Sequence, residues 1–134
     1  MKVAMSFPVA ILNLLFFTAS GFAHHSFAAQ YDAAKLMQFV GTVTKVEWMN
    51  PHARFYVDVK DAQGTVTNWN FELGPPLVLR RLGWKQDSLK IGDQVNVEGY
   101  LAKDGSNMAN AKSLTLADGR SVFAGSSAEG NSTR

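Results

Sequence analysis

Apolar and polar residues alternate through the middle of this chain. In the stretch 54–60 every second residue is apolar, and the pattern returns in the second half of the stretch 65–73. A period of two is typical of a β-strand with one buried face. The residues between the two stretches, DAQG at 61–64, have the composition of a tight turn. The two stretches are therefore predicted to pair as a β-hairpin.

A longer strand is predicted before this hairpin. The stretch 37–48, MQFVGTVTKVEW, is rich in β-branched and aromatic residues. Its apolar positions change parity between Val43 and Val46, and Gly41 interrupts it. Both features are typical of a bulged, strongly coiled strand. The pattern therefore predicts the curvature of a barrel.

Two prolines break the alternation after the hairpin, and the pattern changes to that of a short helix. The stretch 76–83 reads PLVLRRLG, and a proline at its start suits a first helical turn. Arg80 and Arg81 favour the carboxyl end, where the helix dipole is negative. A helix of fewer than about three turns is expected here, as a connector rather than as a member of a bundle.

Apolar alternation resumes at 94–101 and 108–116, and a short apolar piece follows at 121–123. The predicted order is three strands, a short helix and two strands. This order matches the small five-stranded OB-like Greek-key barrel, in which a helix lies between strands three and four. We predict this mainly β fold over residues 37–124. Another small barrel or a sandwich is the alternative.

The first 23 residues have the three regions of a secretory signal peptide, which are a positive charge, an apolar run and a stretch of small residues. Gly21 and Ala23 suit signal peptidase, so cleavage is expected to leave His24 as the mature N-terminus. A retained membrane anchor is the weaker alternative, because the apolar run is shorter than the roughly 20 residues of a membrane span. The protein is therefore expected to be periplasmic or secreted, without membrane contact after cleavage.

Removing 23 of the 134 residues leaves 111, which is the size of one domain. Residues 24–36 are predicted to form an N-terminal arm, with a helical turn near 32–36. Residues 125–134 are small and polar and are predicted to form a disordered tail.

Charge and cysteine content narrow the classes of function. The chain has 13 basic and 11 acidic residues, and Arg80-Arg81 is its only adjacent basic pair. Nucleic-acid binders usually concentrate basic residues, so no nucleic-acid partner is expected. The chain has no cysteine, which excludes disulfides, thiolate metal sites and a lipid-bearing cysteine.

Several segments occur in a combination that points to a family. They are AHHSFAAQYD, GTVTKVEWMNPHARFYVDVKD, NWNFELG and GWKQDSLKIGDQVNVEGYLAKDGSNMANA. Together they cover essentially the whole mature chain, and in this order the sequence resembles the exported bacterial family catalogued as domain of unknown function number 6152. The resemblance implies a small exported protein. It implies no activity and no catalytic residue.

A candidate ligand-binding surface follows from the predicted barrel. OB folds bind ligands across strands two and three and the adjoining loops, often with aromatic stacking platforms. On that surface and in the loop before it, the sequence places Trp48, Asn50, His52, Arg54 and Tyr56. Trp48 also fits the core. The ligand is predicted to be a small molecule or an exported protein.

The three histidines suggest a metal site as an alternative. If His24 becomes the terminus, its amine and imidazole can chelate one metal, with His25 or His52 as a third ligand. Nitrogen ligands of this kind suit copper. In the ordinary interpretation, His24 and His25 belong to a frayed terminus and His52 stabilises its own turn.

No motif for an enzyme is present. The sequence has no cysteine nucleophile, no Gly-x-Ser-x-Gly, no glycine-rich phosphate loop and no His-Glu-x-x-His. The carboxylates of the predicted strands are expected on a solvated face: Glu47, Asp58, Glu72 and Glu98. We therefore predict no catalytic residues and favour a binding protein. An accessory subunit of an exported enzyme is a further alternative.

Overall fold

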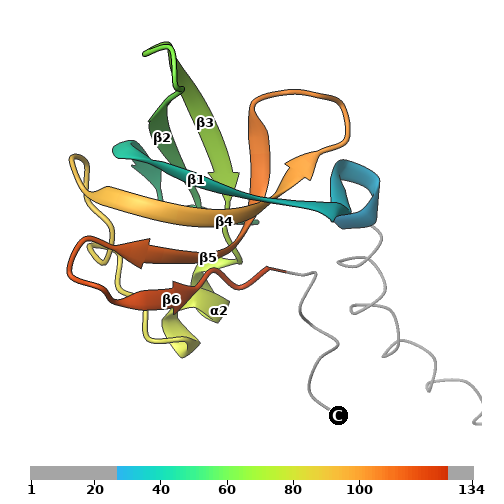
Figure 1. Cartoon of the computed structure of the whole chain (residues 1–134). Helices are drawn as coiled ribbons and strands as arrows, with labels where there is room; N and C mark the ends of the chain where they lie inside the picture. The colour runs from blue at the N-terminus through green and yellow to red at the C-terminus, as the bar shows by residue number, and fades with distance from the viewer. Residues whose placement is uncertain (1–26, 127–134) are drawn as a thin grey trace, which may run out of the picture.

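One sheet of six strands, with a short helix inserted, makes up the part of the chain that the computed structural model describes, residues 27–126 (Figure 1). A helical turn over residues 27–30 precedes the sheet. The elements are β1 (Tyr31–Glu47), β2 (Arg54–Lys60), β3 (Val66–Glu72), α2 (Pro76–Arg81), β4 (Gln94–Ala102), β5 (Met108–Leu116) and β6 (Ser121–Phe123). Within residues 27–126, no helix is long and apolar enough to cross a membrane.

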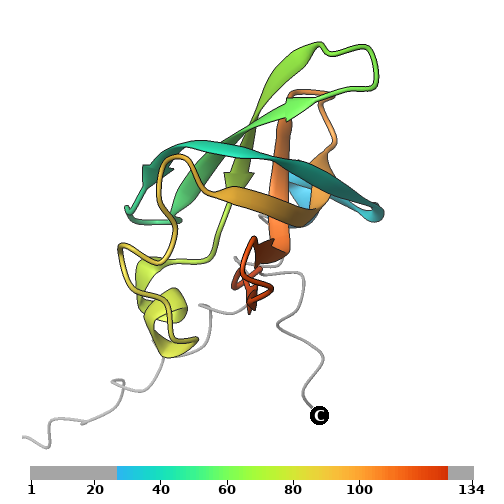
Figure 2. The same ribbon diagram turned by 60° about the vertical axis from the view of Figure 1, so that its left-hand side comes forward.

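The strand order in the sheet is β3-β2-β1-β4-β5-β6, and β3 also pairs with β5. The pairing of β3 with β5 is parallel, whereas all other pairings are antiparallel. The sheet therefore curves until β3 meets β5. The β2–β3 hairpin projects past β1 in both views (Figures 1 and 2). The predicted mainly β fold with a short helix between the third and fourth strands is confirmed.

The long strand β1 carries the bulge that the sequence predicted. Its register against β2 shifts between Val43 and Lys45. Gly41 is required for close approach, because a Cβ atom there would lie 2.1 Å from the backbone oxygen of Asp58. The strand begins at Tyr31, so the helical turn expected at 32–36 is wrong. Those residues pair with β4 or bulge out from it, and the helical turn lies at 27–30 instead.

The predicted apolar faces of the strands enclose the core. Phe55 and Phe71 stack with ring centroids 5.1 Å apart, and Trp69 packs on Phe39 at 4.6 Å. The largest fully buried core side chains include Phe55, Phe71, Leu73, Leu79, Leu114, Val43, Val57 and Val97. Cross-strand contacts between aromatic and β-branched residues are the main stabilising unit of such a sheet.

The helix α2 closes one end of the core. Its Leu79 side chain is fully buried. Trp84 follows it, and its indole Nε1 donates to the backbone oxygen of Phe123 at 2.9 Å. The chain beyond β6 is still packed at Ser126, whose side chain is buried, so the predicted tail is wrong for Gly125 and Ser126. The rest of the predicted tail, 127–134, lies outside the described residues.

Candidate functional site

Glu72, the last residue of β3, is the centre of a buried polar cluster. Only 6% of it is exposed, so the expectation of a solvated face is wrong for this residue. The cause is the position of β3. At this point the strand pairs with Arg54 of β2 on one side and with Asn110 of β5 on the other. Because β3 has a neighbouring strand on both edges here, Glu72 does not have the solvent exposure of a residue on an edge strand.

Three side chains donate hydrogen bonds to the Glu72 carboxylate. Oε2 accepts from the Tyr31 hydroxyl at 3.0 Å and from Arg54 Nη2 at 2.7 Å. Oε1 accepts from Asn110 Nδ2 at 3.3 Å. A buried carboxylate needs such compensation, because an unpaired charge in the interior is strongly unfavourable. These residues and His52, whose Nδ1 lies 3.8 Å from Glu72 Oε1, are called the Glu72 cluster below.

The cluster changes the ionisation of Tyr31. Burial raises the pKa of this phenol well above its ordinary value, and the neighbouring Glu72 carboxylate raises it further. Both effects disfavour a phenolate, since it would be a second negative charge beside Glu72 in a poorly solvated site. Tyr31 is therefore a neutral donor that holds the carboxylate.

A line of polar contacts leads from the cluster along the outward side of β2 and β3. Arg54 Nη1 donates to Asn70 Oδ1 at 3.3 Å, and the Asn70 amide lies 3.5 Å from the Tyr56 hydroxyl. That hydroxyl donates to Glu47 Oε2 at 3.2 Å. Lys45 forms an ion pair with Glu47, and its Nζ lies 5.1 Å from the centroid of the Tyr56 ring.

The same side of the sheet continues with amide and hydroxyl groups. Asn68 Nδ2 donates to Thr44 Oγ1 at 3.0 Å and to Asp58 Oδ1 at 2.7 Å. The surface formed by these outward residues is called the polar face, and its members are Thr44, Lys45, Glu47, Arg54, Tyr56, Asp58, Asn68 and Asn70. Two positive groups, Lys45 and Arg54, and two negative groups, Glu47 and Asp58, are interleaved there. Such a surface offers many donors and acceptors and little net charge.

The loop before β2 places its three predicted site residues differently. Trp48 packs against the hydrophobic core, and its buried Nε1 makes no hydrogen bond. Asn50 is exposed and precedes Pro51 through a cis peptide bond. His52 is half-buried and faces the Glu72 carboxylate. Of the five predicted ligand-binding residues, Arg54 and Tyr56 lie on the polar face and His52 lies beside it.

Of the three predicted metal ligands, His52 alone lies within residues 27–126. His24 and His25 lie outside the described residues. Among residues 27–126, no group of three or more histidine, aspartate or glutamate side chains is arranged to hold a metal ion. His52 has one carboxylate neighbour, Glu72.

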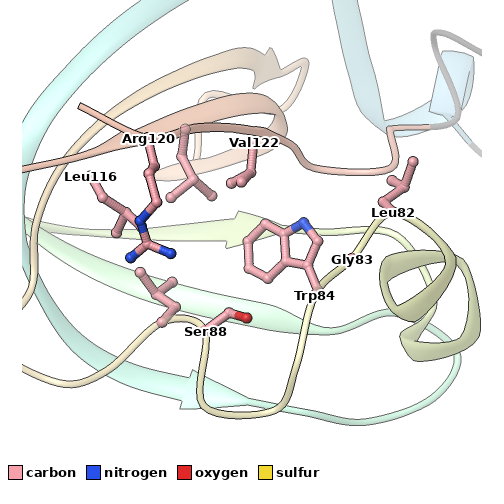
Figure 3. Close-up of a pocket in the computed structure, with 9 residues that line it drawn as sticks. Leu82, Gly83, Trp84, Ser88, Leu116, Arg120 and Val122 are labelled. Atoms are coloured by element: carbon pink, nitrogen blue, oxygen red, sulfur yellow. The ribbon is translucent and has the colours of Figure 1, made fainter. Parts of the chain in front are cut away.

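A small pocket lies at the other end of β5, and it is called the Trp84 pocket below. Figure 3 shows the Trp84 ring and the Arg120 side chain on two sides of it. Its lining is Leu82, Gly83, Trp84, Ser88, Leu89, Leu114, Leu116, Arg120 and Val122. Its volume is about 80 Å³, whereas a cavity that holds benzene has about 150 Å³. The pocket therefore admits a few carbon atoms but no sugar or aromatic ring.

Sequence reasoning missed the residues that connect the site. Glu72, Tyr31 and Asn110 meet only because β1, β3 and β5 converge, and they lie far apart in the sequence. No local signal pointed to Glu72, because Phe71-Glu72-Leu73 alternates apolar and polar residues like an ordinary half-buried strand. The structure nevertheless buries all three residues.

The strand order, with a helix between β3 and β4, defines an OB-like fold. Two crystal structures of Rim1, a mitochondrial single-stranded DNA binding protein of S. cerevisiae, match this chain at 15% sequence identity. One match covers 62% of this chain and 93% of that chain with a TM-score of 0.49. The other covers 64% and 97% with a TM-score of 0.50. At this identity the likeness concerns the fold alone.

The sequence itself gives the family. The model of the family of unknown function DUF6152 matches residues 13–111, which is most of the chain. The chain belongs to this family, which confirms the resemblance found in the sequence. No curated protein matches the chain.

Proposed function

We propose that the protein is an exported, non-enzymatic binding module with an OB-like barrel, released from a signal peptide over residues 1–23. Its polar face binds a neutral, polyhydroxylated ligand such as an oligosaccharide. The observation that carries this proposal is the composition of the polar face, where amides, hydroxyls and charged groups of both signs lie next to one another. OB folds use this side of strands two and three for oligosaccharides and oligonucleotides. Balanced charge favours the neutral ligand, because phosphate backbones are bound mainly through basic residues.

The polar face is also held in place before any ligand arrives. Arg54 is fixed by Glu72 and by Asn70, and Tyr56 is fixed by Glu47. Groups that are already ordered lose less conformational entropy on binding. Asn70 retains hydrogen-bonding capacity, since an amide has two donors and two acceptor sites and the described contacts use only part of them. Asn70 is thus expected to contact the ligand directly.

Calorimetric titration with neutral tetrasaccharides tests this assignment. The probes are the tetramers of glucose in α-1,4 and β-1,4 linkage, of xylose and of N-acetylglucosamine. We expect at least one to bind, and Asn70→Ala to weaken it about fivefold, the value of roughly one hydrogen bond. Asn96→Ala is the matched control, because Asn96 is an exposed asparagine on β4. Absence of binding by all four, or equal effects of the two variants, contradicts the proposal.

A second candidate function is copper binding through the mature N-terminus. It is favoured by the anchoring of the arm beside His52. Tyr31 donates to the same carboxylate that lies 3.8 Å from His52 Nδ1, and Phe27 packs on Tyr31 with ring centroids 5.6 Å apart. His24 is three residues before Phe27, so the two Cα atoms lie at most about 11 Å apart. In this proposal the His24 amine and imidazole bind Cu(II) with His25 or His52.

This candidate is tested with Cu(II) alone. Mass spectrometry of the exported protein first establishes whether His24 is the terminal residue. Cu(II) titration of that form should give a tighter complex than the same chain with an added N-terminal methionine, which lacks the histidine amine. His52→Ala should weaken the complex if His52 is the third ligand. Unchanged affinity in the methionine-extended form contradicts copper binding through the terminus, and it leaves the oligosaccharide proposal untouched.

A further inference from the structure

The first half of β1 has an open edge. Residues 36–40 pair with β4, from Leu36 opposite Tyr100 to Val40 opposite Asn96. The other edge of β1 pairs with β2 only from Gly41 onward. Within residues 27–126 no strand covers the remaining edge at 36–40. Figure 1 shows β1 running past the β2–β3 hairpin toward the helical turn at 27–30.

This edge has no charged residue and no proline to keep it from pairing, and the irregularities of β1 lie on either side of it, at 31–36 and 43–45. Natural edges usually carry charges or proline, or are twisted away by a bulge. The nine residues 36–44, LMQFVGTVT, contain neither a charge nor a proline, although Lys35 and Lys45 flank them. Along the open part, Leu36 is 40% exposed, Met37 47% and Val40 64%. Apolar side chains therefore lie beside unpaired backbone groups.

Other open edges in the described sheet are weaker candidates. The strand β6 has three residues, which is too short for a stable pairing. The open half of β3, residues 66–69, begins beside the hairpin turn and has two adjacent polar residues, Thr67 and Asn68, at its centre. Among the strands of residues 27–126, β1 has the longest open edge with exposed apolar residues and no charge.

We propose that residues 36–40 of β1 pair with the same residues of a second copy of this chain, antiparallel across a two-fold axis at Gln38. The side chains at 36, 38 and 40 point to one face, because a strand has a period of two. In this register Leu36 of each copy lies opposite Val40 of the other, on either side of the central Gln38 pair. Lys35 lies opposite Gly41 of the other copy, so no like charges meet.

The neighbouring registers are less favourable. A two-fold axis at Met37 places Leu36 opposite Gln38, and an axis at Phe39 places Val40 opposite Gln38. In both cases an exposed apolar side chain faces an amide instead of another apolar side chain. Directly opposite residues have Cβ atoms about 4.5–5.5 Å apart, so these pairs decide the register. The axis at Gln38 is the arrangement that pairs Leu36 with Val40.

The first test introduces opposite charges at positions 36 and 40. Dimerisation is then measured by sedimentation equilibrium over a series of protein concentrations. The parent protein, expressed from the full 134-residue sequence, should reach the mass of a dimer. Leu36→Glu and Val40→Lys, each alone, should weaken dimerisation roughly tenfold or more, since each places two charges opposite apolar side chains. The double variant should recover much of the loss, because Glu at 36 then faces Lys at 40 of the other copy. Ile91→Lys is the control, since Ile91 is 72% exposed and lies on the loop before β4, outside residues 36–40.

The second test uses the absence of cysteine from the chain. Gln38→Cys should form a disulfide-linked dimer on mild oxidation, because position 38 faces itself across the axis. Ile91→Cys should not. A monomeric mass of the parent protein at every concentration overturns the proposal. A dimer that responds equally to changes at 40 and 91, or that resists cross-linking at 38, also overturns it.

Discussion

The strand β5 connects two sites of opposite character. Near its start, Asn110 belongs to the Glu72 cluster, where one buried carboxylate accepts hydrogen bonds from three strands. At its end, Leu114 and Leu116 line the Trp84 pocket, which is about 80 Å³ in volume and whose lining residues include five leucine and valine side chains beside Ser88 and Arg120. One site is filled with polar groups that bond to one another, whereas the other has spare room and no carboxylate in its lining.

The two sites are therefore expected to respond differently to substitution. Loss of one member of the Glu72 cluster removes a hydrogen bond from a buried partner, so the cluster fixes one arrangement of β1, β3 and β5. Loss or gain of a methylene group at the Trp84 pocket changes contacts with no charge involved. The polar face depends on the cluster through Arg54, which contacts both. The cluster is therefore the structural support of the proposed binding surface.

The largest effect is expected from Glu72→Ala. The substitution leaves the Arg54 guanidinium, the Tyr31 hydroxyl and the Asn110 amide without their shared acceptor. We expect the free energy of unfolding to fall by about 3–5 kcal/mol, as for other buried pairs that lose one partner. Urea denaturation followed by circular dichroism measures this loss.

The matched control for this variant is Glu98→Ala. Glu98 pairs with Lys112 in a half-exposed ion pair, for which a loss of at most about 1 kcal/mol is expected. If the two substitutions cost the same free energy, the Glu72 cluster does not organise the fold.

A smaller effect, with a distinct pH dependence, is expected from Tyr31→Phe. Near neutral pH the lost hydrogen bond should cost about 1–2 kcal/mol. In the parent protein the raised pKa of Tyr31 means that the folded state resists ionisation of this phenol. The contribution of Tyr31 is therefore complete below its ordinary pKa of about 10 and is lost as the pH rises above this value toward the raised folded-state pKa.

Urea titrations of both proteins at a series of pH values check this prediction. The stability difference between the parent and Tyr31→Phe should shrink above about pH 10, because only the parent has this phenol. The other tyrosines and the lysines titrate in both proteins and cancel. A difference that is constant from neutral to alkaline pH contradicts a buried, neutral Tyr31.

The smallest effect is expected at the Trp84 pocket. Val122→Ile adds one methylene group to its lining, and burial of that group should stabilise the protein by about 0.8 kcal/mol. Thermal unfolding measures the change. Val66→Ile is the control at an exposed position of β3. A destabilised Val122→Ile protein would show that the pocket has no usable room.

The strands and the helix were predictable because local pattern determined them. Alternation in β2 and the proline and arginines of α2 are properties of neighbouring residues. The bulge of β1 was visible as a parity change around Val43. The start of β1 was not, because the alanine-rich residues 32–35 bulge out between Tyr31 and Leu36, which pair with β4, and their own propensity does not predict this.

The candidate site was predictable only in part, for a related reason. Arg54 and Tyr56 were found because strand alternation places them outward. Glu72 was misjudged because its burial depends on the parallel pairing of β3 with β5, which no local pattern encodes. The metal alternative stays a prediction, because two of its three histidines lie outside the described residues.

The central claim is that the polar face, and not the Trp84 pocket, is the binding surface. Two-dimensional amide NMR during titration with the tightest of the four tetrasaccharides tests this claim most directly. The account predicts that shift changes concentrate at residues 44–47, 54–58 and 68–72, with few at 82–89 and 114–122. Changes that concentrate around Trp84 and Arg120 instead would contradict it.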